Sequence, residues 1–141
     1  MSDIGDPDYR ALADLRYQLR RFVAFSEQTA RDIGLEPRQH QLLLAVRGLP
    51  EGVEPTVAVI AERLALRHNT VVELLDRLET AGLARRTRVP DDRRRAHVTI
   101  TSRGQELLRK LSLAHRDELR TSAPALVASL GRVLRSAKKG I

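Results

Sequence analysis

The sequence contains no cysteine, no tryptophan and no long uninterrupted apolar run. The absence of cysteine excludes disulfides, thiol redox sensing, cysteine nucleophiles and cysteine-ligated zinc. No stretch approaches the roughly 18 consecutive apolar residues that a membrane helix requires, and the acidic N-terminal segment does not resemble a secretion signal. We therefore expect a cytoplasmic protein that has no contact with the membrane.

Aromatic residues are also scarce, at 3% of the 141 residues, whereas hydrophobic residues make up 42% and charged residues 30%. The core must then consist mostly of leucine, valine and alanine, and the many Leu, Ala and Arg runs favour helix. A chain of this length can form one domain with a substantial core. We expect a single, mainly α-helical domain over residues 1–141.

Signs of catalysis are weak. The four histidines (His40, His68, His97 and His115) are scattered, with no pair at the helical spacing of a metal site, and no glycine-rich phosphate loop is present. The adjacent Asp91 and Asp92 fit a hairpin turn better than acid–base chemistry. We expect no enzymatic activity, no metal site and no cofactor.

Positive charge is concentrated in two places. The formal net charge is +7, and residues 85–103 contain seven arginines against two aspartates. A second basic cluster ends the chain: Arg132, Arg135, Lys138 and Lys139. Such clusters suit a polyanion, because neutralised phosphates release condensed counterions. The alternative is a solvated basic surface that keeps the protein soluble.

Two short amphipathic segments lie at the centre of the chain, at residues 56–64 and 68–80. In the first, Ile60, Ala61 and Leu64 share one face. The second carries an apolar stripe at positions 71, 74, 75 and 78; His68 or Asn69 can cap its start, and Gly82 can end it in the left-handed region. Two helices joined by a tight turn predict a helix-turn-helix.

A basic hairpin is expected directly after this pair. Ala84–Val89 and Ala96–Ile100 are compatible with strands and flank a polar tip at residues 90–95. Val98 and Ile100 alternate with His97 and Thr99, which places the apolar pair on the core side. Together, residues 36–101 predict a winged helix-turn-helix lobe.

Apolar-striped helices flank this lobe. One is expected from Tyr9 to Ile33, and the next begins at Pro37 and ends at residues 48–50. Thr101 can cap a helix that runs from Ser102 toward Arg120, and a last helix follows a break at residues 121–124. We infer that residues 9–33 and 102–138 are dimerisation helices, because one subunit offers their stripes too few partners. The alternative is that the stripes pack within one subunit.

Several segments in this order resemble the MarR family of bacterial regulators. Residues 92–101, Asp-Arg-Arg-Arg-Ala-His-Val-Thr-Ile-Thr, are similar to the family's wing signature, and residues 35–44 are similar to its second helix. Residues 61–66, 70–71 and 74–83 resemble its helix-turn-helix, and the order of elements matches from about residue 9 to 137. The resemblance implies a homodimeric transcription factor, usually a repressor, on a pseudo-palindromic site in double-stranded DNA.

In this setting helix 68–80 is expected to enter the major groove with its N-terminal residues nearest the bases. Asn69 can pair with adenine, unless it only caps the helix, and His68 can donate to guanine. Val72, or the methyl group of Thr70, can contact a thymine methyl group.

Three charged residues complete the expectations for this helix. Arg67 and Arg77 are expected to meet phosphates, with pairing to Glu73 as the alternative for Arg77. Glu73 departs from the family pattern, which often has a polar or basic residue at this position. A carboxylate beside DNA repels phosphate unless it accepts a hydrogen bond from cytosine N4 or pairs with Arg77.

At the wing, we expect Arg94 to enter the minor groove, because a narrow groove concentrates negative potential and arginine is weakly hydrated. Asp92 is expected to orient Arg94, while Arg93 and Arg95 lean toward phosphates or the outer face. Two further arginines, Arg86 and Arg88, complete the predicted DNA-binding set. The alternative is a solvated hairpin without DNA contacts.

The resemblance also implies release from DNA by a small anionic or aromatic effector. Its candidate residues are Arg16, Tyr17, Arg20, Phe22 and His40, with others on the helix that starts at Ser102. Arginines on such a helix can instead be solvated or form pairs between subunits. A different function is a dimeric winged-helix module that binds protein and has weak or nonspecific DNA binding; Glu73 is the feature that favours it.

Overall fold

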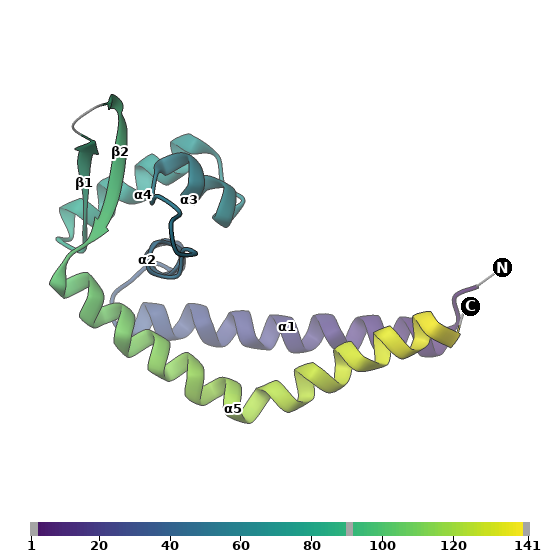
Figure 1. Cartoon of the computed structure of the whole chain (residues 1–141). Helices are drawn as coiled ribbons and strands as arrows, with labels where there is room; N and C mark the ends of the chain where they lie inside the picture. The colour runs from purple at the N-terminus through teal and green to yellow at the C-terminus, as the bar shows by residue number, and fades with distance from the viewer. Residues whose placement is uncertain (1–2, 90–91, 140–141) are drawn as a thin grey trace. The chain divides into compact units, whose positions relative to one another are not determined.

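The computed structural model describes the backbone of residues 3–89 and 92–139 and the side chains of residues 3–88 and 96–135 (Figure 1). Its elements follow in this order: α1 (Asp6–Asp32), α2 (Pro37–Arg47), α3 (Val57–Leu64), α4 (His68–Thr80), β1 (Ala84–Val89), β2 (Asp92–Ile100) and α5 (Ser102–Lys139). The mainly helical fold with a hairpin wing is confirmed. No described helix is long and apolar enough to cross a membrane.

The chain divides into two compact units. One comprises residues 1–29 and 113–141, and the other comprises residues 30–112. We call the first the long-helix unit and the second the winged-helix unit.

The winged-helix unit has an aliphatic core, as the scarcity of aromatic residues predicted. Its fully buried large side chains come from α2, α3, α4, β2 and the first part of α5: Leu42, Leu43, Ile60, Val71, Leu75, Leu78, Val98 and Leu111. Ala61, Leu64 and Ile100 pack against this cluster while partly buried. The predicted apolar faces of α3, α4 and β2 are therefore the faces that the core uses.

Helix α2 begins and ends where the sequence predicted. The backbone N–H of Glu36 donates to Gln39 Oε1 at 2.9 Å, and Pro37 occupies the first helical position. The backbone N–H of Gly48 donates to Leu44 O at 2.8 Å at the other end. Helix α3 starts similarly, because Thr56 Oγ1 accepts a hydrogen bond from the Val59 N–H at 3.3 Å.

The start of α4 differs from the predicted cap. Its N-cap is Arg67, with φ −71° and ψ 151°, and no side chain caps the helix. Ala65 adopts a left-handed conformation (φ 53°), which turns the chain so tightly that helical geometry begins at His68. His68 and Asn69 are therefore inside the first turn, and neither is a cap.

The end of α4 is a Schellman motif, as Gly82 predicted. Gly82 has φ 73°, its N–H donates to Glu79 O at 3.0 Å, and the Leu83 N–H donates to Leu78 O at 2.9 Å. A side chain at position 82 would strain the left-handed conformation. The motif leads the chain directly into β1.

The hairpin is antiparallel, with Ala84 opposite Ile100 and Arg86 opposite Val98. Strand β2 starts at Asp92, four residues before the predicted start at Ala96. The register shifts near the tip, because Ala96 pairs with Arg88 while Asp92 pairs with Val89. Residues 93–95 thus form a bulge in the ladder, and a pattern of alternating hydrophobicity does not reveal extended backbone of this kind. Pro90 and Asp91 lie outside the described residues.

Helix α5 is continuous, so the predicted break at residues 121–124 is wrong. Pro124 lies inside the helix, and Figure 1 shows α5 as one ribbon that bends along its length. A proline removes a single backbone donor and bends the helix. Ala123 directly before the proline and Ala125 and Leu126 directly after it are good helix formers, so the loss is local. The predicted cap at Thr101 is confirmed, because its Oγ1 accepts a hydrogen bond from the Gly104 N–H at 3.1 Å.

In the long-helix unit, α1 packs against α5. Helix α1 begins at Asp6, before the predicted Tyr9, because Asp6 and Asp8 favour the positive end of the helix dipole. Arg132 Nη1 lies 3.0 Å from Asp14 Oδ2, and His115 Nε2 lies 2.7 Å from Ser26 Oγ. These contacts join the two helices at separate points along their length.

Apolar side chains remain exposed in this unit. On α1 they include Leu12, Leu19 and Val23, and on α5 they include Val127, Leu130 and Leu134. Val127 is 69% exposed, although it continues the apolar pattern of the helix. The predicted stripes are thus only partly covered within one chain.

Candidate nucleic-acid interface

The buried face of α4 determines which of its side chains point outward. Val71, Leu74, Leu75 and Leu78 face the core. Opposite them, the helical repeat aligns an exposed stripe: Asn69, Glu73, Asp76 and Thr80. This geometry makes the exposed surface of α4 a polar strip along the helix.

The N-terminal end of α4 presents most of the predicted base-contacting residues together. Arg67, His68 and Asn69 are exposed, while Thr70 and Val72 are half-buried at the edges of the strip. The backbone N–H groups of the first helical turn add a partial positive charge at this end. The first two turns therefore combine donors, one amide and a small apolar surface.

Arg77 contacts a different carboxylate from the one that the sequence suggested. Its Nη1 lies 2.9 Å from Oε2 of Glu36, at the start of α2, and both side chains are more than half exposed. The partner is therefore not Glu73. Such an exposed pair contributes at most about 1 kcal/mol to stability. It nevertheless directs Arg77 toward α2.

Arg86 is held by carboxylates of α4. Its guanidinium donates to Asp76 Oδ1 and to Glu79 Oε1. Burial opposes the charge of the guanidinium, but the hydrogen bonds and the proximity of both carboxylates outweigh this effect and raise the pKa of Arg86. Arg86, which the sequence assigned to DNA, thus links β1 to the C-terminal half of α4. Sequence reasoning missed Asp76 and Glu79, because Arg86 comes close to them only after the chain reverses direction between α4 and β1.

The remaining wing arginines divide into two groups. Arg88 is exposed on β1, where it is available to a ligand. The side chains of Asp92, Arg93, Arg94 and Arg95 lie outside the described residues, although their backbone belongs to β2. The backbone places three of them in the bulge near the tip of the hairpin.

The hairpin is also attached to the segment that precedes α3. The Val98 N–H donates to Pro55 O at 2.9 Å, and Thr56 pairs with His97 in an isolated antiparallel bridge. His97 Nε2 lies 3.6 Å from Glu54 Oε2. The segment of residues 54–56 therefore positions the wing.

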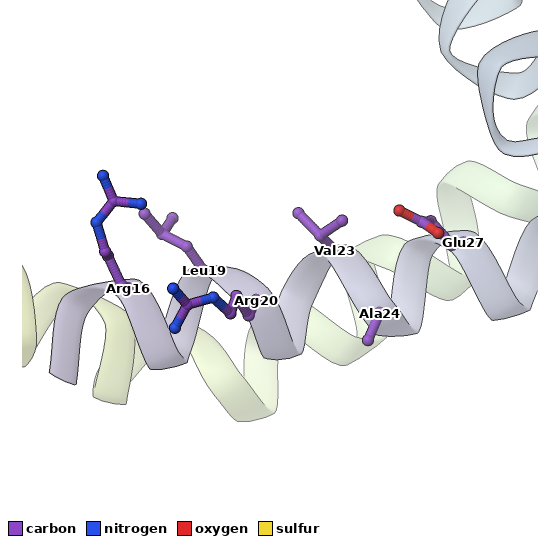
Figure 2. A pocket seen from close by; sticks show the side chains of 6 residues that line it. All are labelled: Arg16, Leu19, Arg20, Val23, Ala24 and Glu27. Carbon is purple, nitrogen blue, oxygen red and sulfur yellow. The ribbon is translucent and has the colours of Figure 1, made fainter. Parts of the chain in front are cut away.

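The predicted effector residues are divided between the two units. On α1, Arg16 and Arg20 line a hollow of about 380 Å³ together with Leu19, Val23, Ala24 and Glu27. Figure 2 shows the side chains of Arg16, Leu19 and Val23 projecting from the same side of α1.

The other three predicted effector residues have different surroundings. Tyr17 is exposed, and the Arg21 guanidinium lies 5.7 Å from its ring centroid. Phe22 meets the His115 ring edge-on at 6.0 Å. His40 is buried in the winged-helix unit, with 3% of its surface exposed.

A second hollow of about 510 Å³ lies in the winged-helix unit. Its lining comes from the end of α2 and the first turns of α5: Leu44, Arg47, Ser102, Gln105, Glu106, Leu108, Arg109 and Ser112. The sequence indicated only that the helix beginning at Ser102 would contribute to a ligand site.

Comparison with known proteins gives consistent matches. Residues 33–95 match the model of the MarR family. The chain is 32% identical over 111 residues to the HTH-type transcriptional regulator YkoM of Bacillus subtilis (strain 168), covering 75% of this chain and 69% of YkoM. It is 32% identical over 83 residues to the HTH-type transcriptional regulator PecS of Dickeya dadantii (strain 3937), covering 57% of this chain but only 49% of PecS. The match therefore spans about half the length of PecS.

Solved structures share the fold. AbsC, a MarR family transcriptional regulator from Streptomyces coelicolor, superposes with a TM-score of 0.75 at 21% identity, covering 99% of this chain and 97% of AbsC. BpsR of Bordetella bronchiseptica, whose DNA binding is regulated by 6-hydroxynicotinic acid, has a TM-score of 0.64 at 26% identity and coverages of 88% and 95%. Members of this family are transcriptional regulators and not enzymes. The winged helix-turn-helix, the exposed polar strip of α4 and these matches agree: the chain belongs to the MarR family of DNA-binding transcriptional regulators.

Proposed function

We propose that this regulator is a homodimeric repressor that binds a pseudo-palindromic operator in the cytoplasm. The observation that carries the proposal is the polar strip at the start of α4, from Arg67 to Glu73, which is exposed while the opposite face is anchored in the core. In the major groove, Asn69 pairs with adenine and His68 donates to guanine. Arg67 contacts phosphate, and Val72 or Thr70 meets a thymine methyl group.

The exposed apolar residues of the long-helix unit support the dimer. Leu12 on α1, with Val127 and Leu130 on α5, are each between 45% and 69% exposed in a single chain. A second copy that covers these residues removes their surface from water. Such burial stabilises the dimer by about 25 cal/mol for each Å² of apolar area. A twofold dimer then presents two α4 helices to half-sites about one helical turn apart.

We propose that the wing binds in the minor groove beside each half-site. Arg94 enters the groove and Asp92 orients it, while Arg88, Arg93 and Arg95 meet phosphates. Arg86 has a different part: it is bound to Asp76 and Glu79 and keeps the hairpin aligned with α4. The proposal thus assigns one wing arginine of the predicted set to positioning and the other wing arginines to DNA.

The experiment that tests this function is selection of duplexes from a random pool by the purified protein at two salt concentrations. We expect a palindrome with half-sites one turn apart, and an affinity that falls steeply as salt rises, because phosphate contacts release counterions. Arg94→Ala should weaken binding of the selected duplex by about 1–3 kcal/mol without changing the unfolding transition. Recovery of no motif at either salt concentration would refute the operator proposal.

We also propose that a small aromatic anion regulates binding through Arg16 and Arg20. The two guanidiniums and the apolar Leu19 and Val23 line one hollow, and this combination suits a carboxylate on a flat ring. With 6-hydroxynicotinate as the probe, we expect the wild type to bind in calorimetry and to lose affinity for the selected duplex. If Arg16→Ala with Arg20→Ala binds the probe as well as the wild type does, the ligand site lies elsewhere.

A further inference from the structure

Glu73 is the only carboxylate in the first two turns of α4. It lies on the outward stripe of the helix, one turn after Asn69, and its side chain is exposed. In a groove between two phosphate backbones, a carboxylate in this position is repelled unless a donor meets it. The identity of that donor is therefore important for how this helix reads DNA.

The protein itself supplies no such donor within the described part of the chain. Arg77, one turn farther along α4, is bound to Glu36 at 2.9 Å. Arg86, which approaches the same helix from β1, is bound to Asp76 and Glu79. Among the described residues, no ion pair reaches Glu73, whereas the other two carboxylates of α4 share one guanidinium.

Only one base has a major-groove edge that presents a hydrogen-bond donor with no acceptor beside it. In the major groove, guanine presents the acceptors N7 and O6, and thymine presents the acceptor O4 and a methyl group. Adenine places the N7 acceptor beside its amino group, so a carboxylate there gains one hydrogen bond and meets one repulsion. Cytosine presents its N4 amino group as a donor, with no acceptor beside it on that edge.

We infer that Glu73 is a specificity-determining residue, which accepts a hydrogen bond from the N4 amino group of a cytosine in each half-site. The inference rests on the proposed function, because it requires α4 to lie in the major groove. Since Asn69 and Glu73 are one turn apart on the same stripe, the cytosine lies within a few base pairs of the base that Asn69 contacts. The carboxylate also discriminates against guanine and thymine by repulsion from their acceptors.

The test is a binding panel on the selected duplex and its single-base variants. At one position in each half-site, the wild type is expected to prefer cytosine by about fivefold to tenfold over each other base. Glu73→Ala should abolish this preference at that position alone. Glu73→Gln should move the preference toward adenine, because an amide can pair with N6 and N7 together.

Glu62→Gln is the matched control for charge. Glu62 is exposed on the neighbouring helix α3, outside the proposed contacts, and its replacement removes the same unit of negative charge. We expect this variant to retain the cytosine preference while its affinity rises by a similar factor for every duplex.

Two results would overturn the inference, and the binding panel distinguishes them. If Glu73→Gln raises affinity equally for all duplexes, as Glu62→Gln should, then Glu73 only repels DNA and reads no base, while the operator proposal stands. If the wild type discriminates among no duplexes, the proposed function fails and the role of Glu73 fails with it.

Discussion

Replacing Gly104 with alanine is expected to lower the free energy of unfolding by about 3 kcal/mol. Gly104 lies in the first turn of α5, where an added Cβ would be 2.2 Å from the Leu83 carbonyl oxygen and 2.7 Å from Ile100 Cγ2. The carbonyl cannot move away cheaply, because it accepts a hydrogen bond from the Thr101 N–H at 3.1 Å. Chemical denaturation of both proteins at the same concentration measures the difference.

Gly131→Ala is the control in the same helix. Its added Cβ would meet only the flexible end of Arg135, at 3.1 Å from Nη1, so we expect no loss of stability and a gain of up to about 1 kcal/mol from helix propensity. An unfolding midpoint for Gly104→Ala equal to that of the wild type would show that α5 can move away from the Leu83 carbonyl. The close packing at this position would then not be essential.

A charge on the exposed stripe of α5 is expected to have the largest effect on function. Val127→Asp places a carboxylate where a second copy would bury an apolar side chain that is 69% exposed in the single chain. Burial of an unpaired charge costs several kcal/mol, so we expect a monomer at micromolar concentration. Because two linked half-site contacts are then reduced to one, operator affinity should fall at least about 100-fold. Light scattering and duplex titration measure the two effects.

Ala128→Asp is the charge-matched control for this experiment. Ala128 is also exposed on α5 but lies outside the stripe of Val127, Leu130 and Leu134. This variant should remain dimeric and bind the operator like the wild type. If Val127→Asp itself stays dimeric with unchanged affinity, the subunit contact does not use this stripe.

Local signals made much of the fold predictable. The bounds of α3 and α4, the left-handed Gly82 and the cap at Thr101 each depend on residues close together in the sequence, so the sequence sufficed to place them. The outward position of Glu73 also follows from the spacing of the apolar residues on α4. The repeat of the α-helix determines which side is buried and which side remains exposed to a ligand.

Contacts between distant segments were not predictable in the same way. Arg77 pairs with Glu36 across 41 positions, and Arg86 binds Asp76 only because the Schellman motif turns β1 back along α4. A proline at position 124 normally indicates the start or end of a helix, yet here the surrounding helix formers carry α5 through it. In each case, tertiary geometry decided among choices that the sequence pattern left open.

The bridge between Thr56 and His97 has a consequence for solubility. A two-stranded sheet has two open edges, each of which can recruit a strand from another molecule and start aggregation. Near the core, the outer edge of β2 is occupied by the Pro55 carbonyl and by Thr56. Farther out, the bulge interrupts the ladder, and residues 93–95 are all arginine. Irregular backbone and like charge therefore oppose the addition of a strand from another molecule at this edge of the wing.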